Sequence, residues 1–199
     1  MRDFEDYCWR DAVSATELHI YAAYVRERMV GKRPALLIVH PGAGIEIAPA
    51  WIAPAAQLLA EARLRGMPVV HSLPPGAAAV AKLEPLAAEP VCARPCESAF
   101  FSSDLERTLT TNKAQSLVVC GAPTSGALRA SVIESKSYGY KVALAEETVG
   151  DESAFLHKMA LFDMAHKYGD VMSLAELIEQ LDAGKAGILE HPSAEIPQA

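Results

Sequence analysis

Short apolar runs alternate with longer amphipathic segments along most of the chain. The first run, Pro34–Val39, reads Pro-Ala-Leu-Leu-Ile-Val and has no polar alternation, which is typical of a strand buried on both faces of a parallel sheet. Further strands are predicted at residues 67–71, 91–93, 116–120, 141–145 and 171–172. Helices are predicted between them, at residues 51–65, 102–111, 125–138, 151 or 153 to 168, and 173–181. This alternation predicts an α/β fold, a doubly wound, mainly parallel six-stranded sheet with helices on both faces, in a Rossmann-like three-layer arrangement.

The first 33 residues are predicted to form an N-terminal helical arm. Ser14-Ala-Thr-Glu17 is a capping-box sequence, and the helix that it begins is expected to run to about Arg28. The apolar face of this helix has no evident partner within the chain; it consists of Leu18, Tyr21, Ala22 and Val25. Aromatic residues typical of protein interfaces occur in the same region: Tyr7, Trp9, Tyr21 and Tyr24. The arm therefore predicts an oligomer.

The composition fits one domain with an arm and a tail. Of the 199 residues, 51% are hydrophobic, which is enough for a sizeable core in a domain at 34–183, followed by a mobile tail at 184–199. The formal net charge of −7 argues against nucleic acid or an anionic membrane surface as a partner. No apolar run reaches the roughly 18 residues of a transmembrane helix. The N-terminus is acidic and polar, unlike a secretory signal, so we expect a cytoplasmic protein with reduced thiols.

The candidate chemistry lies at the predicted carboxyl ends of the strands, because ligands of doubly wound sheets bind there. Those ends are His40, His71 or Ser72, Arg94, the turn at residues 121–124, and the pair at 146–147. His40 and His71 end neighbouring strands and invite a metal reading, but no third ligand is evident.

No metal and no cofactor is expected elsewhere. Cys92 and Cys96 are spaced one residue too widely for a metal-type pair and have no second half. Pro41-Gly-Ala-Gly44 lacks the Gly-Lys-Ser/Thr end of a phosphate loop.

Four stretches of the chain resemble the isochorismatase-like cysteine hydrolase family, in particular the branch that contains N-carbamoylsarcosine amidohydrolase and maleamate amidohydrolase. They are residues 34–40, 91–101, 117–127 and 155–172, and the likeness spans about residues 7–182. The resemblance implies the isochorismatase-like fold and a dimer or tetramer. It also implies a cis peptide bond just before the turn threonine, here between Ala122 and Pro123.

Active members of this family use a triad of Asp, Lys and Cys, and the resemblance places the three positions at His40, Arg94 and Ala127. All three are therefore substituted, and Ala127 has no nucleophilic atom. Cys96, on a loop two residues after Arg94, is the one plausible substitute thiol, since Cys120 is expected in the core. The resemblance thus implies a degenerate family member.

Three functions are compatible with these substitutions. The first is a protein without amidohydrolase activity that binds a small carboxylate or amide or serves as a regulatory subunit, as a homo-oligomer or beside an active paralogue. The alternative is a repurposed enzyme in which His40 supplies acid–base chemistry and Arg94 clamps the carboxylate of a small substrate, without a cysteine nucleophile. The third is residual amide hydrolysis through Cys96 or an activated water.

The residues expected to line the ligand site are His71, Cys96, Ala122, Pro123 and Thr124. Arg94 is open to two interpretations, anion binding or a structural ion pair with a nearby glutamate. The candidates for such a pair are Glu97, Glu146 and Glu147.

Overall fold

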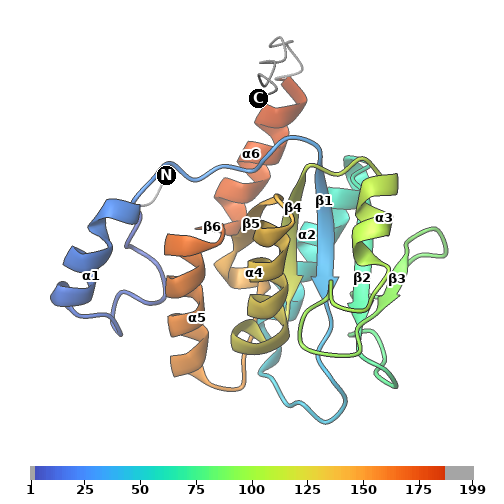
Figure 1. The fold of residues 1–199 in the computed structure, drawn as a ribbon, viewed down its shortest axis with the longest axis horizontal. Coiled ribbons are helices and arrows are strands. Elements are labelled where there is room, and N and C mark those ends of the chain that lie inside the picture. Colours follow the sequence, from blue (N-terminus) through green and yellow to red (C-terminus); the bar gives the residue numbers. More distant parts are fainter. Residues whose placement is uncertain (1–2, 187–199) are drawn as a thin grey trace, which may run out of the picture.

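Six parallel strands form one sheet in the order β3-β2-β1-β4-β5-β6 in this computed structural model, which describes residues 3–186 (Figure 1). The predicted α/β architecture is confirmed. The central strands β1 and β4 are the most apolar runs of the chain and are buried along nearly their whole length, as a strand covered on both faces must be. The strands are β1 (Pro34–Val39), β2 (Val69–Leu73), β3 (Val91–Ala93), β4 (Ser116–Gly121), β5 (Lys141–Ala145) and β6 (Asp170–Met172).

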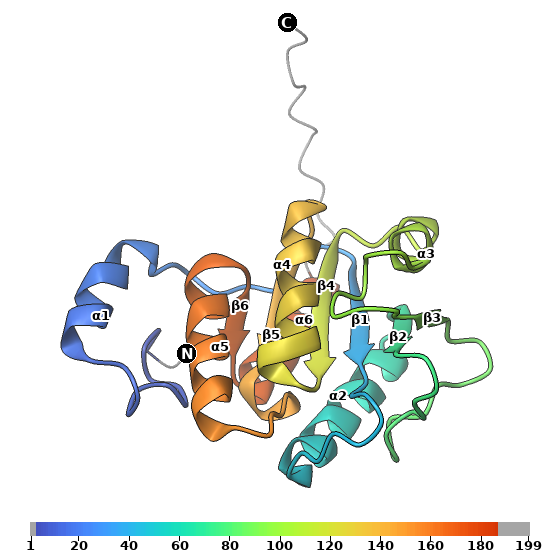
Figure 2. The same ribbon diagram turned by 60° about the horizontal axis from the view of Figure 1, so that its bottom comes forward.

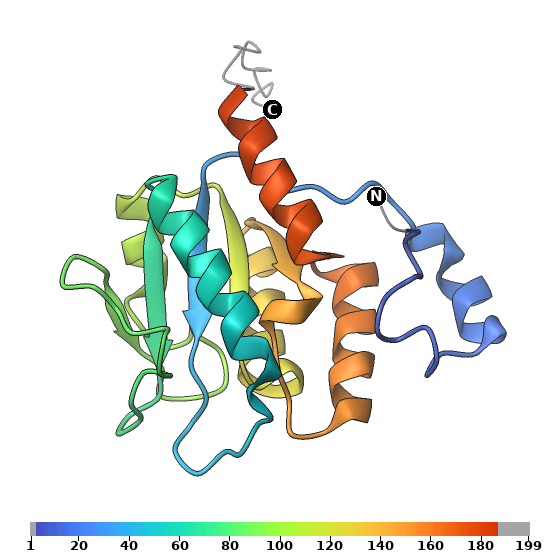
Figure 3. The same ribbon diagram turned by 180° about the vertical axis from the view of Figure 1, so that it is seen from behind.

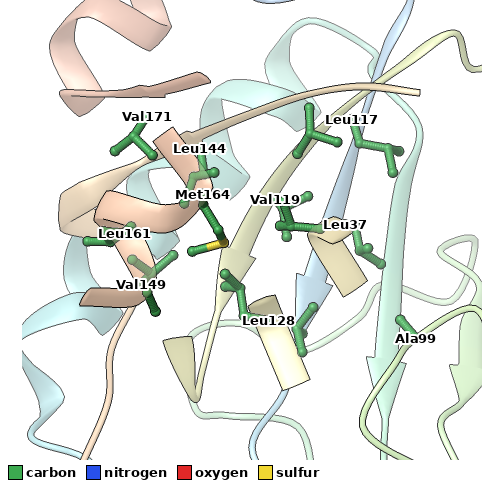
Figure 4. Packing of buried hydrophobic residues seen from close by; sticks show 14 of the residues in the cluster. Leu37, Ala99, Leu117, Val119, Leu128, Leu144, Val149, Leu161, Met164 and Val171 are labelled. Carbon is green, nitrogen blue, oxygen red and sulfur yellow. The ribbon is translucent and has the colours of Figure 1, made fainter. Parts of the chain in front are cut away.

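Helices cover both faces of the sheet and enclose two hydrophobic cores (Figures 1 and 3). On one face lie α3 (Leu105–Thr111), α4 (Arg129–Ser137) and α5 (Ala154–Lys167). On the other lie α2 (Ile52–Leu64) and α6 (Leu174–Ala186). Figure 4 shows the first core, where Met164 of α5 and Leu128 lie over Leu144 and Val119 of the sheet. Because successive strand residues point to opposite faces, each strand contributes to both cores.

The strand order reverses direction between β1 and β4, which makes their carboxyl ends the topological switch point of the sheet (Figure 2). The two strands stay close there, since Val39 lies opposite Gly121 in the register. Gly121 has a φ of +124°, and a Cβ at this position would lie 2.0 Å from the Val39 carbonyl oxygen. Only glycine fits this approach, so the turn that follows β4 is held against the end of β1.

The helix of the N-terminal arm is shorter than predicted. Helix α1 (Ala15–Tyr21) begins at the predicted capping box of Ser14 and Glu17, but it ends at Tyr21 instead of Arg28. A short 3-10 turn (Ala22–Tyr24) follows, and the backbone is extended at Val25. Beyond it, Arg26 donates from Nε to Asp170 Oδ1 at 3.0 Å, which draws the segment along β6 and α6 in place of another helical turn.

The interpretation of Tyr7 and Trp9 as oligomer-interface residues is wrong. Trp9 is fully buried within the protomer, where it stacks on Tyr7 at 5.1 Å and meets Phe162 edge-on. Arg28 lies between the rings of Phe4 and Tyr7, 4.4 and 4.2 Å from their centroids, so the segment before α1 is fastened to the domain.

Part of the predicted interface on the arm remains exposed, including Val25, and Ile20 and Met29 are exposed beside it. Tyr24 keeps about half of its surface exposed and α1 buries no residue, whereas Tyr21 packs on Phe162. The oligomer itself stays a prediction.

Helix α6 continues beyond the predicted end at residue 181 to Ala186. Most of the predicted tail at 184–199 lies outside the described residues. Within residues 3–186, no helix is both long and apolar enough to span a membrane.

Candidate functional site

The switch point brings together the residues that follow β1, β3 and β4. His40 directly follows β1 and continues its ladder, since its N–H donates to the Ser72 carbonyl at 3.0 Å. Arg94 follows the edge strand β3, and its Nη2 donates to the His40 carbonyl at 2.7 Å. In the turn after β4, Ala122 donates to the Val39 carbonyl at 2.9 Å, and the predicted cis bond between Ala122 and Pro123 is confirmed.

A buried hydrogen-bonded chain begins at His40. Its Nε2 lies 3.0 Å from His71 Nδ1, so the predicted proximity of the two histidines is confirmed. Beyond it, His71 Nε2 lies 3.1 Å from Glu89 Oε2, and Arg63 of α2 binds the same carboxylate through Nε and Nη2, both at 2.8 Å. Neither histidine has any exposed surface.

One contact fixes the direction of this chain. The backbone N–H of Val80 donates to His40 Nδ1 at 3.1 Å, so the proton of a neutral His40 ring is on Nε2. His40 Nε2 then donates to His71 Nδ1, and His71 Nε2 donates to Glu89. Both nitrogens of His40 are thereby used inside the protein.

The charges of the chain follow from burial and hydrogen bonding. Burial, helped by the nearby His71 and Arg94, lowers the pKa of His40 to about 4. Burial also lowers the pKa of His71, against the opposing hydrogen bond to Glu89. For Glu89, burial alone would raise the pKa, but hydrogen bonds from Arg63, the Leu86 N–H and His71 outweigh it and lower the pKa to about 2. At neutral pH both rings are therefore neutral and Glu89 is ionised.

Arg94 is buried without a counter-ion. It is 5% exposed, and its guanidinium donates to two carbonyls, those of His40 and Cys96, the latter at 3.2 Å. Among residues 3–186, no carboxylate lies within 4.0 Å of it, so the predicted pair with a glutamate does not form. Glu146 and Glu147 are engaged elsewhere, with the N–H groups of Cys8 and Leu174.

Ala127 lies in an irregular helical turn (Thr124–Leu128) between β4 and α4, and is 2% exposed. Its methyl group belongs to the core under α4, and its carbonyl accepts a hydrogen bond from Ser131 Oγ at 2.7 Å. The side chain offers no group that can attack, accept or donate.

Hydrogen bonds anchor the turn to α5 and to the segment just before it. Thr124 donates its N–H and its hydroxyl to the Gly150 carbonyl, at 2.8 and 2.9 Å, and Thr124 Oγ1 lies 2.9 Å from His157 Nδ1. Ser125 N–H donates to Asp151 Oδ2 at 2.7 Å. Thr124 is completely buried and anchors the turn, and its role in ligand binding stays a prediction.

The cysteines offer no activated thiol. Cys96 is exposed, as its place on a loop predicts, and its one polar thiol contact within the described residues is with the Phe101 carbonyl, at 4.0 Å. Cys120 lies in the core, as predicted, and burial raises its pKa to about 12. Cys8 is half-buried beside Glu146, and its pKa is also raised to about 12, chiefly by burial.

No group of three His, Cys, Asp or Glu residues in the described part of the chain is arranged to hold a metal ion.

The far end of the histidine chain was harder to predict than its start. The sequence gives no signal for Glu89, which completes the histidine chain with Arg63, because residues 72–90 carry no periodic pattern. Alternation from His71 along β2 would have indicated that His71 faces α2, the helix that carries Arg63.

Comparison with known proteins agrees with the geometry. The isochorismatase domain family matches residues 38–176. Maleamate amidohydrolase of Pseudomonas putida KT2440 is 32% identical over 188 residues, covering 76% of this chain and 88% of that protein. N-carbamoylsarcosine amidase of an Arthrobacter species is 32% identical over 102 residues, covering 51% of this chain and 39% of that protein.

Solved structures agree as well. A hydrolase of the isochorismatase family from Chromobacterium violaceum superimposes with a TM-score of 0.70 at 26% identity, covering 80% of this chain and 98% of that one. An isochorismatase from Pseudomonas putida KT2440 has the same fold, with a TM-score of 0.70 at 23% identity, covering 83% of this chain and 100% of that one. Since the family's domain matches well over half of the chain and the sheet has the fold of its solved members, this protein belongs to the isochorismatase family.

Proposed function

We propose that this chain is an isochorismatase-family protein without amidohydrolase activity, which binds a small molecule at the switch point as a binding protein or regulatory subunit. The observation that carries the proposal is the pair of groups at the ends of β1 and β4. Ala127 supplies no nucleophile, and His40 is sealed inside the protein with both ring nitrogens engaged. Covalent amide hydrolysis needs a nucleophile and a base within reach of each other and of the substrate.

A repurposed enzyme that uses His40 as its acid or base is disfavoured by the same contacts. A catalytic base must reach the substrate, directly or through one water. The His40 ring is completely buried and would have to break its bond with Val80 or with His71 to do so. Protonating the ring in place is also costly, because its pKa is lowered to about 4.

Hydrolysis through Cys96 is disfavoured by the hydrogen bonds around its thiol. A reactive thiolate is stabilised by a nearby cation, a histidine or a helix N-terminus. Within the described residues, the Cys96 thiol contacts only a carbonyl oxygen. The neighbouring guanidinium of Arg94 interacts electrostatically with the Cys96 thiol, but within the described residues its hydrogen bond goes to the Cys96 carbonyl on the main chain and none goes to the sulfur.

The test is an amidase assay on the purified protein. Maleamate and N-carbamoylsarcosine, the compounds named in two relatives, serve as substrates, with the Pseudomonas putida maleamate amidohydrolase as the positive control. We expect no ammonia release above the protein-free rate. Ala127→Cys alone should stay inactive, because His40 and Arg94 stand where active members have Asp and Lys, His40 lies on the opposite face of the sheet, and general acid–base assistance is worth roughly 100- to 10,000-fold.

Two results would refute the proposal. Turnover by the natural chain that is lost in His40→Ala would establish the repurposed enzyme, and turnover lost in Cys96→Ser would establish thiol hydrolysis. The triple change His40→Asp, Arg94→Lys and Ala127→Cys is expected to recover weak hydrolysis if the substrate pocket is retained.

A further inference from the structure

Two buried polar atoms at the switch point lack any hydrogen-bond partner within the described residues. They are the hydroxyl oxygen of Ser72 on β2 and Nε of Arg94 after β3. Ser72 is fully buried and Arg94 is 5% exposed. Buried polar groups are nearly always satisfied, so two orphaned groups on adjacent strands call for a partner that is not part of the chain.

Both side chains lie on the same face of the sheet. Ser72 is opposite Val39 on one side and Cys92 on the other, and both neighbours belong to the core under α4 that also contains Ala127. Arg94 continues the ladder, since its N–H donates to the Leu73 carbonyl at 2.7 Å, and it follows Cys92 by two residues. Strand alternation therefore places Ser72 and Arg94 on the Ala127 face.

His40 and His71 lie on the opposite face. The residues two positions before them, Ile38 and Val69, belong to the core under α2, and the histidine chain ends at Arg63 of that helix. The sheet thus separates the satisfied histidines from the orphaned Ser72 and Arg94.

We propose that Ser72 and Arg94 bind a small monocarboxylate on the Ala127 face of the switch point. A guanidinium has five N–H donors, and the chain uses two of those of Arg94, leaving Nε and two others. This inference rests on the proposed small-molecule function and assigns its ligand class.

The charge and donor count select this class. One buried cation without a counter-ion matches a single negative charge. The planar fork of arginine fits the two oxygens of a carboxylate, and the Ser72 hydroxyl can donate one more hydrogen bond to the same group. A doubly charged phosphate would need a second cation, whereas the charged side chain that acts on Arg94 is the carboxylate of Glu97.

Glu97 is the internal competitor of such a ligand. It is exposed, it follows Arg94 by three residues, and its Oε2 would lie 3.3 Å from a Cβ on Gly126, so its carboxylate rests against the turn that carries Ala127. Burial lowers the pKa of Arg94, and the attraction of the Glu97 carboxylate is the largest effect that opposes this lowering. A bound anion would sit beside this negative charge, and removing the charge should tighten binding.

The experiment is an NMR titration of the full chain at pH 7, in which the Arg94 Nε–H resonance is followed as sodium acetate is added. Sodium chloride at equal ionic strength is the reference. We expect a saturable shift with acetate only. Glu97→Gln should lower the acetate Kd about threefold or more, whereas Glu152→Gln, an exposed glutamate elsewhere, should leave it unchanged. Ser72→Ala should raise the Kd about tenfold, the effect of losing one hydrogen bond to a charged group.

Equal responses to acetate and chloride, or an unchanged Kd in Glu97→Gln, would overturn the inference. Because Glu97 is exposed, this variant is expected to fold even where Arg94→Gln does not. Acetate has no bond for an amidase to cleave, so the titration stands apart from the amide assay. Amide turnover would refute the proposed function, and acetate binding alone decides the carboxylate site.

Discussion

Replacing Glu89 by glutamine should destabilise the protein strongly although the residue lies in a loop. Glu89 Oε2 accepts three hydrogen bonds, from Arg63 Nη2 at 2.8 Å, the Leu86 N–H at 2.8 Å and His71 Nε2 at 3.1 Å. Oε1 accepts a fourth, from Arg63 Nε at 2.8 Å. A glutamine has one acceptor oxygen and turns an amide N–H₂ toward at least one of these donors, so an isosteric change removes both the charge and part of the bonding.

The magnitude follows from the pKa. The carboxyl is held at about 2 against an ordinary value of 4.5, a difference of about 2.5 pKa units. At 1.36 kcal/mol per unit, the folded state favours the ionised carboxyl by about 3 kcal/mol more than the unfolded chain does. The side chain is 11% exposed, so solvent screening reduces this figure little. We expect Glu89→Gln to lower the free energy of unfolding by about 2–3 kcal/mol, since the new amide keeps some of the contacts.

Urea denaturation at pH 7, followed by far-ultraviolet circular dichroism, measures this change. The matched control is Glu84→Gln, an exposed side chain five residues earlier in the same loop, which should alter stability by less than about 0.5 kcal/mol. The ionised carboxyl stabilises the folded state above pH 4.5, and this stabilisation is lost as the pH falls through about 2. The free energies of unfolding of the natural chain and of Glu89→Gln should therefore converge in acid. Equal stability of Glu89→Gln and Glu84→Gln at neutral pH would refute the reasoning.

Two further predictions test other parts of the structure. Because His40 is neutral in the folded state with a pKa of about 4 against an ordinary 6.5, stability should fall by up to about 3 kcal/mol between pH 6.5 and 4, and urea midpoints of His40→Gln should show a shallower fall; a flat profile for the natural chain would contradict the buried neutral ring. Trp9→Ala should lower the free energy of unfolding in urea by about 3–5 kcal/mol, because the indole is fully buried in the protomer, whereas Tyr24→Ala should lower it much less, because Tyr24 is half exposed. Equal effects of the two substitutions would contradict the burial of Trp9.

The strands and their burial were predictable, because continuous apolar runs of this length are typical of buried strands. The runs at β1 and β4 need both faces covered, and the helices between strands supply that cover. The meeting of His40 with His71 was equally accessible, since parallel neighbours end at one edge of a sheet.

What escaped prediction depends on contacts between distant segments. The sequence predicts Trp9 as an interface residue because no nearby residue indicates that Phe162, far along the chain, covers it. It predicts a helix beyond Tyr21 because helix propensity does not include the hydrogen bond between Arg26 and the distant Asp170. Glu89 lies in a segment without periodicity, and its role appears only once β2 and α2 are side by side.

Polar groups at the carboxyl ends of β1, β2 and β3 are divided between the two faces of the sheet, and this division distinguishes the site from a catalytic one. On the α2 face, the bond from Val80 to His40 fixes each later proton up to Glu89, so the chain has one stable polarity and resists carrying a proton in the other direction. Such a network holds β1, β2 and α2 together and leaves no group free for substrate. On the Ala127 face, Ser72 and Arg94 keep unused donors. A fully satisfied network serves stability, whereas donors that stay unsatisfied at a topological switch point are of use only when a ligand arrives. The two faces of one strand edge therefore divide structural support from binding.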